Sequence, residues 1–154
     1  MPKIEPRLLN SQLCFALYSA NKNYNHFYQA ALEPFSLTYA QYITLLALWE
    51  ESPLTVKKLG SKLNLDSGTL TPLLKRLEKQ GWVIRKRSKN DERQVNVSLT
   101  ELAVKNRDEV YDRVNNCMNI VNIPNQEYHD LIEELQRIGT KLEAAATSDK
   151  IKTD

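Results

Sequence analysis

Two similar helix starts in the middle of the sequence constrain its fold more than any other feature. Leu54-Thr55 and Leu65-Asp66 each place an apolar residue directly before a side chain that can cap a helix. A leucine stands five positions after each apolar residue, at Leu59 and at Leu70, and completes a hydrophobic staple in both cases. The repeated pattern predicts two helices that begin in quick succession.

The first of these helices is short, over about 55–63, and Asn64-Leu65 forms the turn after it. The second covers about 66–80 and ends at Gly81, because glycine readily adopts the left-handed conformation that follows many helices. Two helices joined by so tight a turn, the second more basic than the first, predict a helix-turn-helix.

A β-hairpin is expected immediately after the second helix. An apolar and basic segment, 82–87, leads into the polar loop 88–93. Residues 94–99 then alternate polar and apolar side chains strictly, as a half-buried strand does. The hairpin over about 82–99 has a charged tip and forms the wing of a winged helix-turn-helix.

Long amphipathic helices flank this unit. Apolar residues recur at three- and four-residue steps over about 11–32, and Pro34 ends that helix. Thr38 and Gln41 form the capping box of the next helix. After the wing, one helix is expected to about residue 121 and another from Pro124 to about 146, each with an apolar stripe.

We therefore predict a mainly α fold with a small β-hairpin wing. A chain of 154 residues suits one domain with appended helices. The predicted segments are an N-terminal dimerisation helix (1–36), a winged helix-turn-helix domain (37–100, with its recognition helix at about 66–80), C-terminal dimerisation helices (101–146) and a flexible tail (147–154).

The positive charge gathers in one block, residues 54–93. This block holds eleven Lys/Arg and four Asp/Glu, a net charge of +7. The other 114 residues hold the remaining ten basic and fifteen acidic side chains, a net charge of −5. Such a distribution favours binding to a polyanion, although a solvated basic face remains an alternative.

Double-stranded DNA is the expected polyanion. Its major groove admits one α-helix and shows a different donor and acceptor pattern for each base pair. The residues expected to contact bases or phosphates from the recognition helix are Ser67, Thr69, Thr71, Lys75, Arg76 and Lys79. Those expected to contact the flanking backbone or minor groove from the wing are Lys86, Arg87, Lys89 and Arg93. A winged helix that contacts only proteins is the alternative.

A homodimer is the expected assembly. One recognition helix reads few bases, whereas two helices related by a twofold axis read a palindrome. The long helices outside the basic block are apolar and acidic overall, and we expect them to form the dimer interface.

Other classes of protein fit the sequence less well. No apolar run approaches the roughly 20 residues of a membrane span, so we expect a cytoplasmic protein with Cys14 and Cys117 as reduced thiols. His26 and His129 lie far apart without a partner at ligand spacing, so no metal site is expected. Neither a catalytic site nor a cofactor is predicted.

Five stretches of the sequence form a recognisable set: Leu-Cys-Phe-Ala-Leu-Tyr (13–18), Leu-Thr-Tyr-x-Gln-Tyr (37–42), Leu-Trp-Glu (48–50), Leu-Asp-Ser-Gly-Thr-Leu-Thr-Pro-Leu-Leu-Lys-Arg-Leu-Glu (65–78) and Asp-Glu-Arg-x-Val (91–95). They resemble the MarR family, and more narrowly its OhrR branch of repressors that sense organic peroxides. The resemblance covers roughly residues 8–105 and implies a dimeric winged-helix fold.

The resemblance also implies roles for individual residues. Cys14 matches the cysteine that reacts with peroxide, and Tyr28 and Tyr39 match two tyrosines that polarise this cysteine from the partner subunit. In the wing, Asp91 and Arg93 match a pair in which the aspartate orients an arginine that enters the minor groove. A cysteine in the first turn of a helix is expected to favour the thiolate, which attacks peroxide and becomes a sulfenic acid.

Cys117 resembles the second, resolving cysteine that some members of the OhrR branch carry in the helix after the wing. The mechanism implied is oxidation of Cys14 by organic hydroperoxide, an intersubunit disulfide between Cys14 and Cys117, and release of operator DNA. The alternative for Cys117 is a small buried apolar residue beside Met118.

Three other functions remain open. MarR relatives released by a small aromatic ligand or a quinone share most of these motifs. A broader redox regulator of virulence or biofilm genes also fits the resemblance. A thiol peroxidase would use two cysteines too, but the sequence has neither Cys-x-x-Cys nor a thioredoxin-like pattern.

Overall fold

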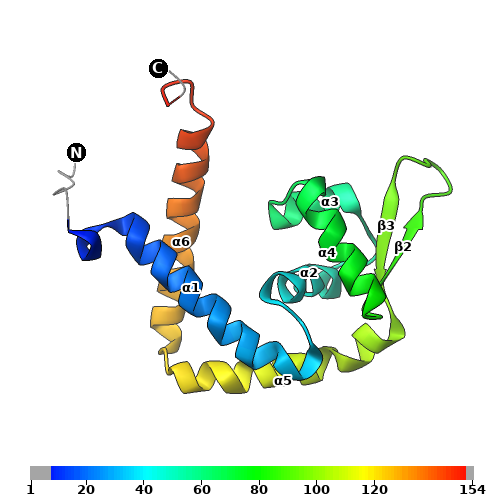
Figure 1. Ribbon diagram of the computed structural model, residues 1–154, viewed down its shortest axis with the longest axis horizontal. Coiled ribbons are helices and arrows are strands. Elements are labelled where there is room, and N and C mark those ends of the chain that lie inside the picture. Colours follow the sequence, from blue (N-terminus) through cyan, green and yellow to red (C-terminus); the bar gives the residue numbers. More distant parts are fainter. Residues whose placement is uncertain (1–7, 152–154) are drawn as a thin grey trace. The chain divides into compact units, whose positions relative to one another are not determined.

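The computed structural model describes residues 8–151 and is mainly helical with one small sheet (Figure 1). The chain divides into two compact units at Asn115/Asn116, which we describe separately. Residues 1–7 of the predicted N-terminal segment and residues 152–154 of the predicted tail lie outside the described residues.

The first unit begins with a short 3₁₀ turn, η1 (Leu9–Ser11), and the helix α1 (Leu13–Leu32). The helix starts two residues later than predicted, because the 3₁₀ turn uses residues 9–11 and Gln12 becomes the N-cap residue. A second 3₁₀ turn, η2 (Glu33–Phe35), contains Pro34 and ends α1 as expected. The first long helix of the unit therefore has 20 residues.

The capping box predicted for the next helix, α2 (Tyr39–Glu50), is present. The backbone N–H of Gln41 donates to Thr38 Oγ1 (3.2 Å), and the N–H of Thr38 donates to Gln41 Oε1 (2.9 Å). Two N–H groups that a helix start leaves without partners are thereby satisfied.

The helix-turn-helix consists of α3 (Val56–Leu63) and α4 (Ser67–Lys79). Asn64 adopts a left-handed conformation (φ 54°) in the turn. The turn packs so closely on α3 that a Cβ at Gly60 would lie 2.7 Å from the carbonyl oxygen of Leu65. Asp66 caps α4 by accepting from the N–H of Thr69 (2.7 Å), and Gly81 follows the helix with φ 85°, as predicted.

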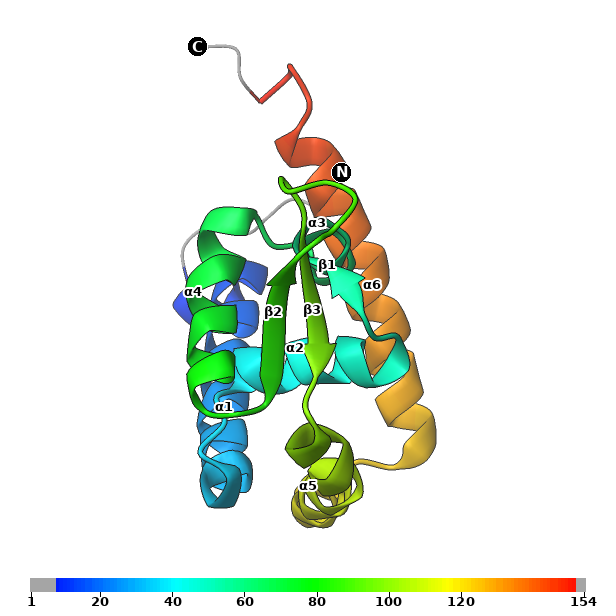
Figure 2. The same cartoon turned by 90° about the vertical axis from the view of Figure 1, so that its right-hand side faces the viewer.

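The sheet has three antiparallel strands, one more than predicted (Figure 2). The hairpin strands β2 (Val83–Arg87) and β3 (Val95–Leu99) pair with Arg85 opposite Val97. The extra strand β1 (Leu54–Thr55) pairs with the outer edge of β3. It has only two residues, and its second residue, Thr55, also caps α3, so its sequence shows the helix start and not the strand.

One apolar core joins the helix-turn-helix, α2 and the sheet. Its fully buried side chains come from each of these elements, which places α4 firmly on the rest of the unit. They include Leu45, Leu48, Leu59, Leu70, Leu74, Leu77, Val83 and Val97.

The helix α5 (Glu101–Val121) begins at Thr100, whose hydroxyl accepts from the N–H of Ala103 (3.2 Å). It crosses the division between the units. The second unit also contains α6 (Asn125–Ala146), which begins after Pro124 as predicted and has no buried residue. No helix within residues 8–151 is long and apolar enough to cross a membrane.

Candidate nucleic-acid interface and reactive cysteine

The predicted contact residues of the recognition helix lie on the side of α4 that faces away from the core. Leu70, Leu74 and Leu77 fix the orientation of the helix because their side chains are fully buried. Thr71 is half-buried at the edge of the buried stripe. The other predicted contact residues of α4 are exposed: Ser67, Thr69, Lys75, Arg76 and Lys79.

The wing carries its predicted contact residues at the end of β2 and in the loop between β2 and β3. All five of these side chains are exposed: Lys86, Arg87, Lys89, Asp91 and Arg93. Asp91 Oδ1 accepts a hydrogen bond from the backbone N–H of Arg93 (3.0 Å). The aspartate side chain therefore stabilises the backbone conformation at Arg93. No hydrogen bond between Asp91 and the Arg93 guanidinium is among the interactions of residues 8–151.

A groove of about 320 Å³ separates the start of α4 from the wing. It brings together three residues that the sequence predicted separately, Ser67 and Thr71 from α4 and Arg93 from the wing. Thr55 and Lys57 from the start of α3 line it as well. Sequence reasoning counted Lys57 in the basic block but did not select it, because only the fold shows that the start of α3 adjoins the wing.

Two basic side chains of the block form ion pairs with acidic residues of the same chain. Arg85 forms a two-point contact with Glu78 (3.0 and 2.9 Å), and Lys62 pairs with Glu50 (2.8 Å). The hydrogen bonds from Arg85 lower the pKa of the Glu78 carboxyl. Among residues 8–151, the ion pairs of the basic block use only Lys62 and Arg85, and the other nine cations are exposed.

Cys14 is an exposed free thiol in the first turn of α1. Its position in the first turn of the helix follows the prediction, and Gln12 is the N-cap residue. Tyr28 lies on the same helix fourteen residues later, which is about 21 Å along a helix axis. Cys14 therefore cannot contact Tyr28 of its own chain.

Tyr28 and Tyr39 form the centre of an aromatic cluster, together with Tyr24, Phe27 and Tyr42. The rings of Tyr28 and Tyr39 stack with centroids 4.5 Å apart and planes within 7°. Tyr28 is only 8% exposed, and its burial raises the pKa of its hydroxyl well above the usual range. The two tyrosines that the resemblance selected thus share one site, in which Tyr28 keeps its proton.

Cys117 lies four residues before the end of α5, in the second unit. It is a half-buried free thiol. His26 and His129 are exposed, and no group of three or more possible metal ligands occurs within residues 8–151.

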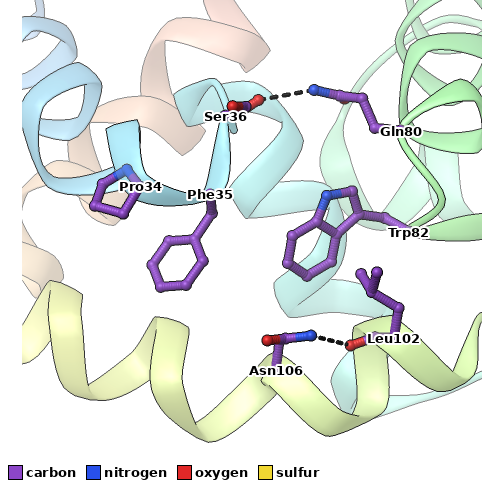
Figure 3. Close-up of a pocket in the computed structure, with 7 residues that line it drawn as sticks. All are labelled: Pro34, Phe35, Ser36, Gln80, Trp82, Leu102 and Asn106. Atoms are coloured by element: carbon purple, nitrogen blue, oxygen red, sulfur yellow. Dashed lines mark hydrogen bonds between the residues drawn. The ribbon is translucent and has the colours of Figure 1, made fainter.

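An amide bridge connects α2 with the end of the recognition helix, and sequence reasoning missed it. Gln41, 4% exposed, donates from Nε2 to Gln80 Oε1 (2.9 Å), and Gln80 Nε2 donates to the carbonyl oxygen of Ser36 (2.8 Å). Ser36 and Gln80 line a pocket of about 380 Å³ together with Phe35 and Trp82 (Figure 3). Residues 41 and 80 are too far apart in sequence for any periodic pattern to link them.

Comparison with known proteins identifies the family. Residues 26–110 match the family described as transcriptional regulator SarA/Rot. The organic hydroperoxide resistance transcriptional regulator of Bacillus subtilis is 52% identical over 99 residues, which cover 64% of this chain and 67% of the relative. The MarR protein of Escherichia coli bound to operator DNA has a TM-score of 0.74 at 25% identity, over 86% of this chain and 99% of MarR.

The chain belongs to the MarR family. A solved structure of reduced AbfR of Staphylococcus epidermidis bound to DNA has a TM-score of 0.76 at 40% identity, over 87% of this chain and 94% of AbfR. The disulfide-formed state of AbfR has a TM-score of 0.65 at 38% identity, over 84% and 91% of the two chains. This MarR-family protein is a transcriptional regulator with a winged helix-turn-helix.

Proposed function

We propose that the protein is a dimeric, redox-sensing repressor that binds palindromic operator DNA when Cys14 is reduced and leaves it when organic hydroperoxide oxidises Cys14. One observation carries the DNA-binding part. The exposed face of α4 and the adjoining wing present hydroxyls and cations on both sides of a groove, while the leucines of α4 fix the helix on the core. AbfR and MarR, which share the fold, are known in DNA-bound structures.

In this proposal α4 enters the major groove with its first turns toward the base edges. Ser67, Thr69 and Thr71 offer hydroxyls and methyl groups there, with Lys75 one turn further along. Arg76 and Lys79 contact phosphates. Lys86, Arg87 and Lys89 contact the flanking backbone, and Arg93, on the turn that Asp91 holds, enters the minor groove.

The dimer is proposed to form through the helical segments outside the winged helix. In α6 the apolar side chains recur on one stripe and are exposed: Tyr128, Leu131, Ile132, Leu135 and Leu142. Leu9 and Leu13 at the start of the first unit are exposed as well. A second copy that covers these residues would remove an apolar surface from water and set the spacing of two recognition helices.

The redox step takes place at Cys14. The thiolate attacks the terminal oxygen of the hydroperoxide, the O–O bond breaks, and the alkoxide leaves and takes up a proton to become the alcohol. The sulfur, oxidised by two electrons, becomes a sulfenic acid. The distance along α1 supports a site in which Tyr28 and Tyr39 of one subunit act on Cys14 of the other.

We further propose that the Cys117 thiol of the partner subunit attacks this sulfenic acid, which forms a disulfide and releases water. A bridged pair needs Cα atoms about 5.5–6 Å apart. Formation of the bond would therefore constrain α1 of one subunit against α5 of the other. The disulfide-formed state of AbfR supports this step by similarity.

Fluorescence anisotropy on a labelled duplex from upstream of the protein's own gene tests the proposal at fixed salt concentration, before and after addition of cumene hydroperoxide. Wild-type protein should bind tightly and release the duplex after oxidation, whereas Cys14→Ser should stay bound. Cys117→Ser should form no disulfide-linked dimer, and if its oxidative release is still fast and reversible, Cys117 is not the resolving cysteine.

Three outcomes would contradict the proposal. Release by a quinone or an aromatic ligand but not by hydroperoxide would point to the ligand-responsive type of regulator. If the protein binds the upstream duplex no more tightly than a random duplex, the proposed specific binding to an operator in that duplex is contradicted. Catalytic turnover of hydroperoxide with a thiol reductant, unaffected by loss of DNA binding, would favour a thiol peroxidase.

A further inference from the structure

The amide bridge between Gln41 and Gln80 has no role in the proposed function, yet it holds the C-terminal end of the recognition helix. Gln80 is the C-cap residue of α4. Its Oε1 accepts from Gln41 Nε2 (2.9 Å), and its Nε2 donates to the carbonyl oxygen of Ser36 (2.8 Å). Gln41 Oε1 accepts in turn from the backbone N–H of Thr38 (2.9 Å). Both ends of this series of hydrogen bonds therefore lie on residues 36–38, directly before α2.

The Gln41 side chain makes the position of Gln80 specific. Gln41 is only 4% exposed, so the oxygen and the nitrogen of its amide both need partners within the protein. The oxygen takes part in the capping box of α2, which leaves the nitrogen for α4. A buried amide without an acceptor is costly, so Gln41 favours the arrangement in which Gln80 Oε1 lies within hydrogen-bond distance. One side chain thereby joins the start of α2 to the end of α4.

Apolar packing alone does not fix this end of α4. The three buried leucines hold the helix on the core, but apolar contacts have no preferred direction and tolerate small shifts along the helix axis. Packing beside Gln80 is also incomplete, because Ser36, Gln80 and Trp82 line the pocket of about 380 Å³ (Figure 3). Hydrogen bonds, by contrast, weaken steeply when their geometry changes. The amide bridge therefore supplies a directional contact where the apolar contacts are weakest.

The residues at the other end of α4 show why such a contact matters for DNA. Ser67, Thr69 and Thr71 have short side chains, so the position of the helix backbone decides whether their hydroxyls reach the base edges. Hydrogen bonds form at donor–acceptor distances of about 2.7–3.2 Å, so a displacement of α4 by about 1 Å would break such contacts. Lys75 and Arg76 have long side chains that can follow a phosphate through the same displacement.

We propose that Gln80 is a positioning residue for operator recognition. Through Gln41 and the carbonyl oxygen of Ser36, it holds α4 where the short hydroxyl side chains reach the base edges. The inference rests on the proposed function, because it requires that α4 enters the major groove. Loss of the amide bridge therefore lowers the preference for operator over random DNA, whereas the electrostatic attraction to any duplex stays the same.

The test compares wild type and Gln80→Met by fluorescence anisotropy on the labelled upstream duplex and on a random duplex of the same length. A reductant is present throughout, so the result does not depend on the cysteines. Methionine has a similar length but no amide, and Gln80 is exposed, so the apolar core and the capping box of α2 stay intact. Affinity for the upstream duplex should fall by about tenfold, while affinity for the random duplex and the salt dependence of both stay unchanged.

Asn106→Leu is the matched control. The Asn106 amide lines the same pocket but donates within α5, to the carbonyl oxygen of Leu102 (2.8 Å). Its loss should leave the affinity for both duplexes unchanged. Urea unfolding of each variant shows whether the protein is fully folded under the conditions of the binding measurements.

A double-mutant cycle identifies what Gln80 positions. Ser67→Ala combined with Thr69→Val removes two hydroxyls from the first turn of α4. This change should weaken operator binding less in Gln80→Met than in wild type, because the displaced helix has already lost those contacts. Arg76→Ala removes a proposed phosphate contact and should weaken binding by the same factor in both backgrounds.

The outcomes separate the inference from the proposed function. A wild-type protein with no preference for the upstream duplex would contradict the proposed function. A clear preference in wild type that Gln80→Met retains would overturn only the role of Gln80. Losses of equal size on the two duplexes, or a Gln80→Met protein that is partly unfolded, would show a general stabilising role and no positioning. Hydroxyl substitutions with equal effects in both backgrounds would also overturn the inference.

Discussion

The winged helix and α6 are both built from amphipathic segments, but only the winged helix buries its apolar side chains within one chain. Leu59, Leu70, Leu74 and Leu77 are fully buried in the core. In α6 the corresponding stripe stays open to solvent, and Leu135 is 53% exposed. Helical periodicity therefore predicts that a helix has an apolar face, but it does not show whether that face is buried by the same chain or by another one.

Charge separates the two regions in the same way. Residues 54–93 carry eleven basic and four acidic side chains, whereas α6 carries two basic and five acidic ones, a net charge of −3. A basic surface over a core that is already buried is suited to bind a polyanion. A solvent-exposed apolar stripe on an acidic helix is suited to pack against a second copy of the chain. Under the proposed function, DNA contact and dimerisation therefore belong to different parts of the sequence.

Disruption of the α6 stripe should have the largest effect. Leu135→Asp places a carboxylate in the proposed interface, where its burial without a partner is costly. We expect the dimer to dissociate and operator affinity to fall by about a hundredfold or more, because one recognition helix reads too few bases. Sedimentation velocity and anisotropy measure the two effects.

Thr140→Asp is the control for this substitution, since it adds the same charge to the other side of α6. It should leave the dimer intact. A Leu135→Asp protein that remains dimeric at micromolar concentration would show that α6 is not the interface, and the comparison between the two regions would fail.

Leu74→Ala tests the winged helix, whose apolar core is buried within a single chain. Leu74 is fully buried on α4, and its truncation should lower the free energy of unfolding by about 3 kcal/mol. The loss should be the same at every protein concentration, whereas substitutions in the α6 stripe should make stability depend on concentration. Urea unfolding at two concentrations measures the difference. Equal concentration dependence for both would mean that the winged helix also relies on the partner.

The sequence predicted the parts of the fold that depend on local chemistry. The capping box at Thr38, the cap at Asp66 and the glycine at position 81 all rest on residues a few positions apart. What it missed depends on contacts between distant segments. The strand β1 and the amide bridge from Gln41 to Gln80 have no local pattern, because their partners lie about 40 residues away.

The candidate site divides along the same line. Helical periodicity was sufficient to put Ser67, Thr69 and Lys75 on the outer face of α4, since one buried stripe fixes the opposite side. It was not sufficient to show that Lys57 adjoins the wing. The roles of Tyr28 and Tyr39 came from the family resemblance alone, and only the fold places their rings together.

Arg93→Ala sharpens the basic side of the comparison. Loss of one minor-groove arginine should weaken operator binding by about tenfold and reduce the slope of log K against log salt by about one. The dimer and the unfolding free energy should be unchanged, because Arg93 is exposed in the wing loop. Lys105→Ala, on the exposed side of α5 outside the basic block, is the control. Equal losses for the two would indicate nonspecific charge attraction and no wing contact.

The smallest expected effect is on the pH dependence of the stability of the winged helix. The Arg85 hydrogen bonds lower the pKa of Glu78 in the folded protein, whereas in the unfolded chain this carboxyl has its ordinary value. The stabilisation is therefore fully present above the unfolded pKa and disappears as pH falls through the folded one. Because the pair is partly exposed, its contribution is modest.

Glu78→Gln should consequently be slightly less stable than wild type at pH 7, and the difference should shrink on acidification below about pH 4. Arg85→Met should reproduce that pH dependence, since it removes the same interaction from the other side. A Glu78→Gln protein whose unfolding curve runs parallel to that of the wild type down to low pH would mean that α4 and β2 are held together by their apolar contacts alone.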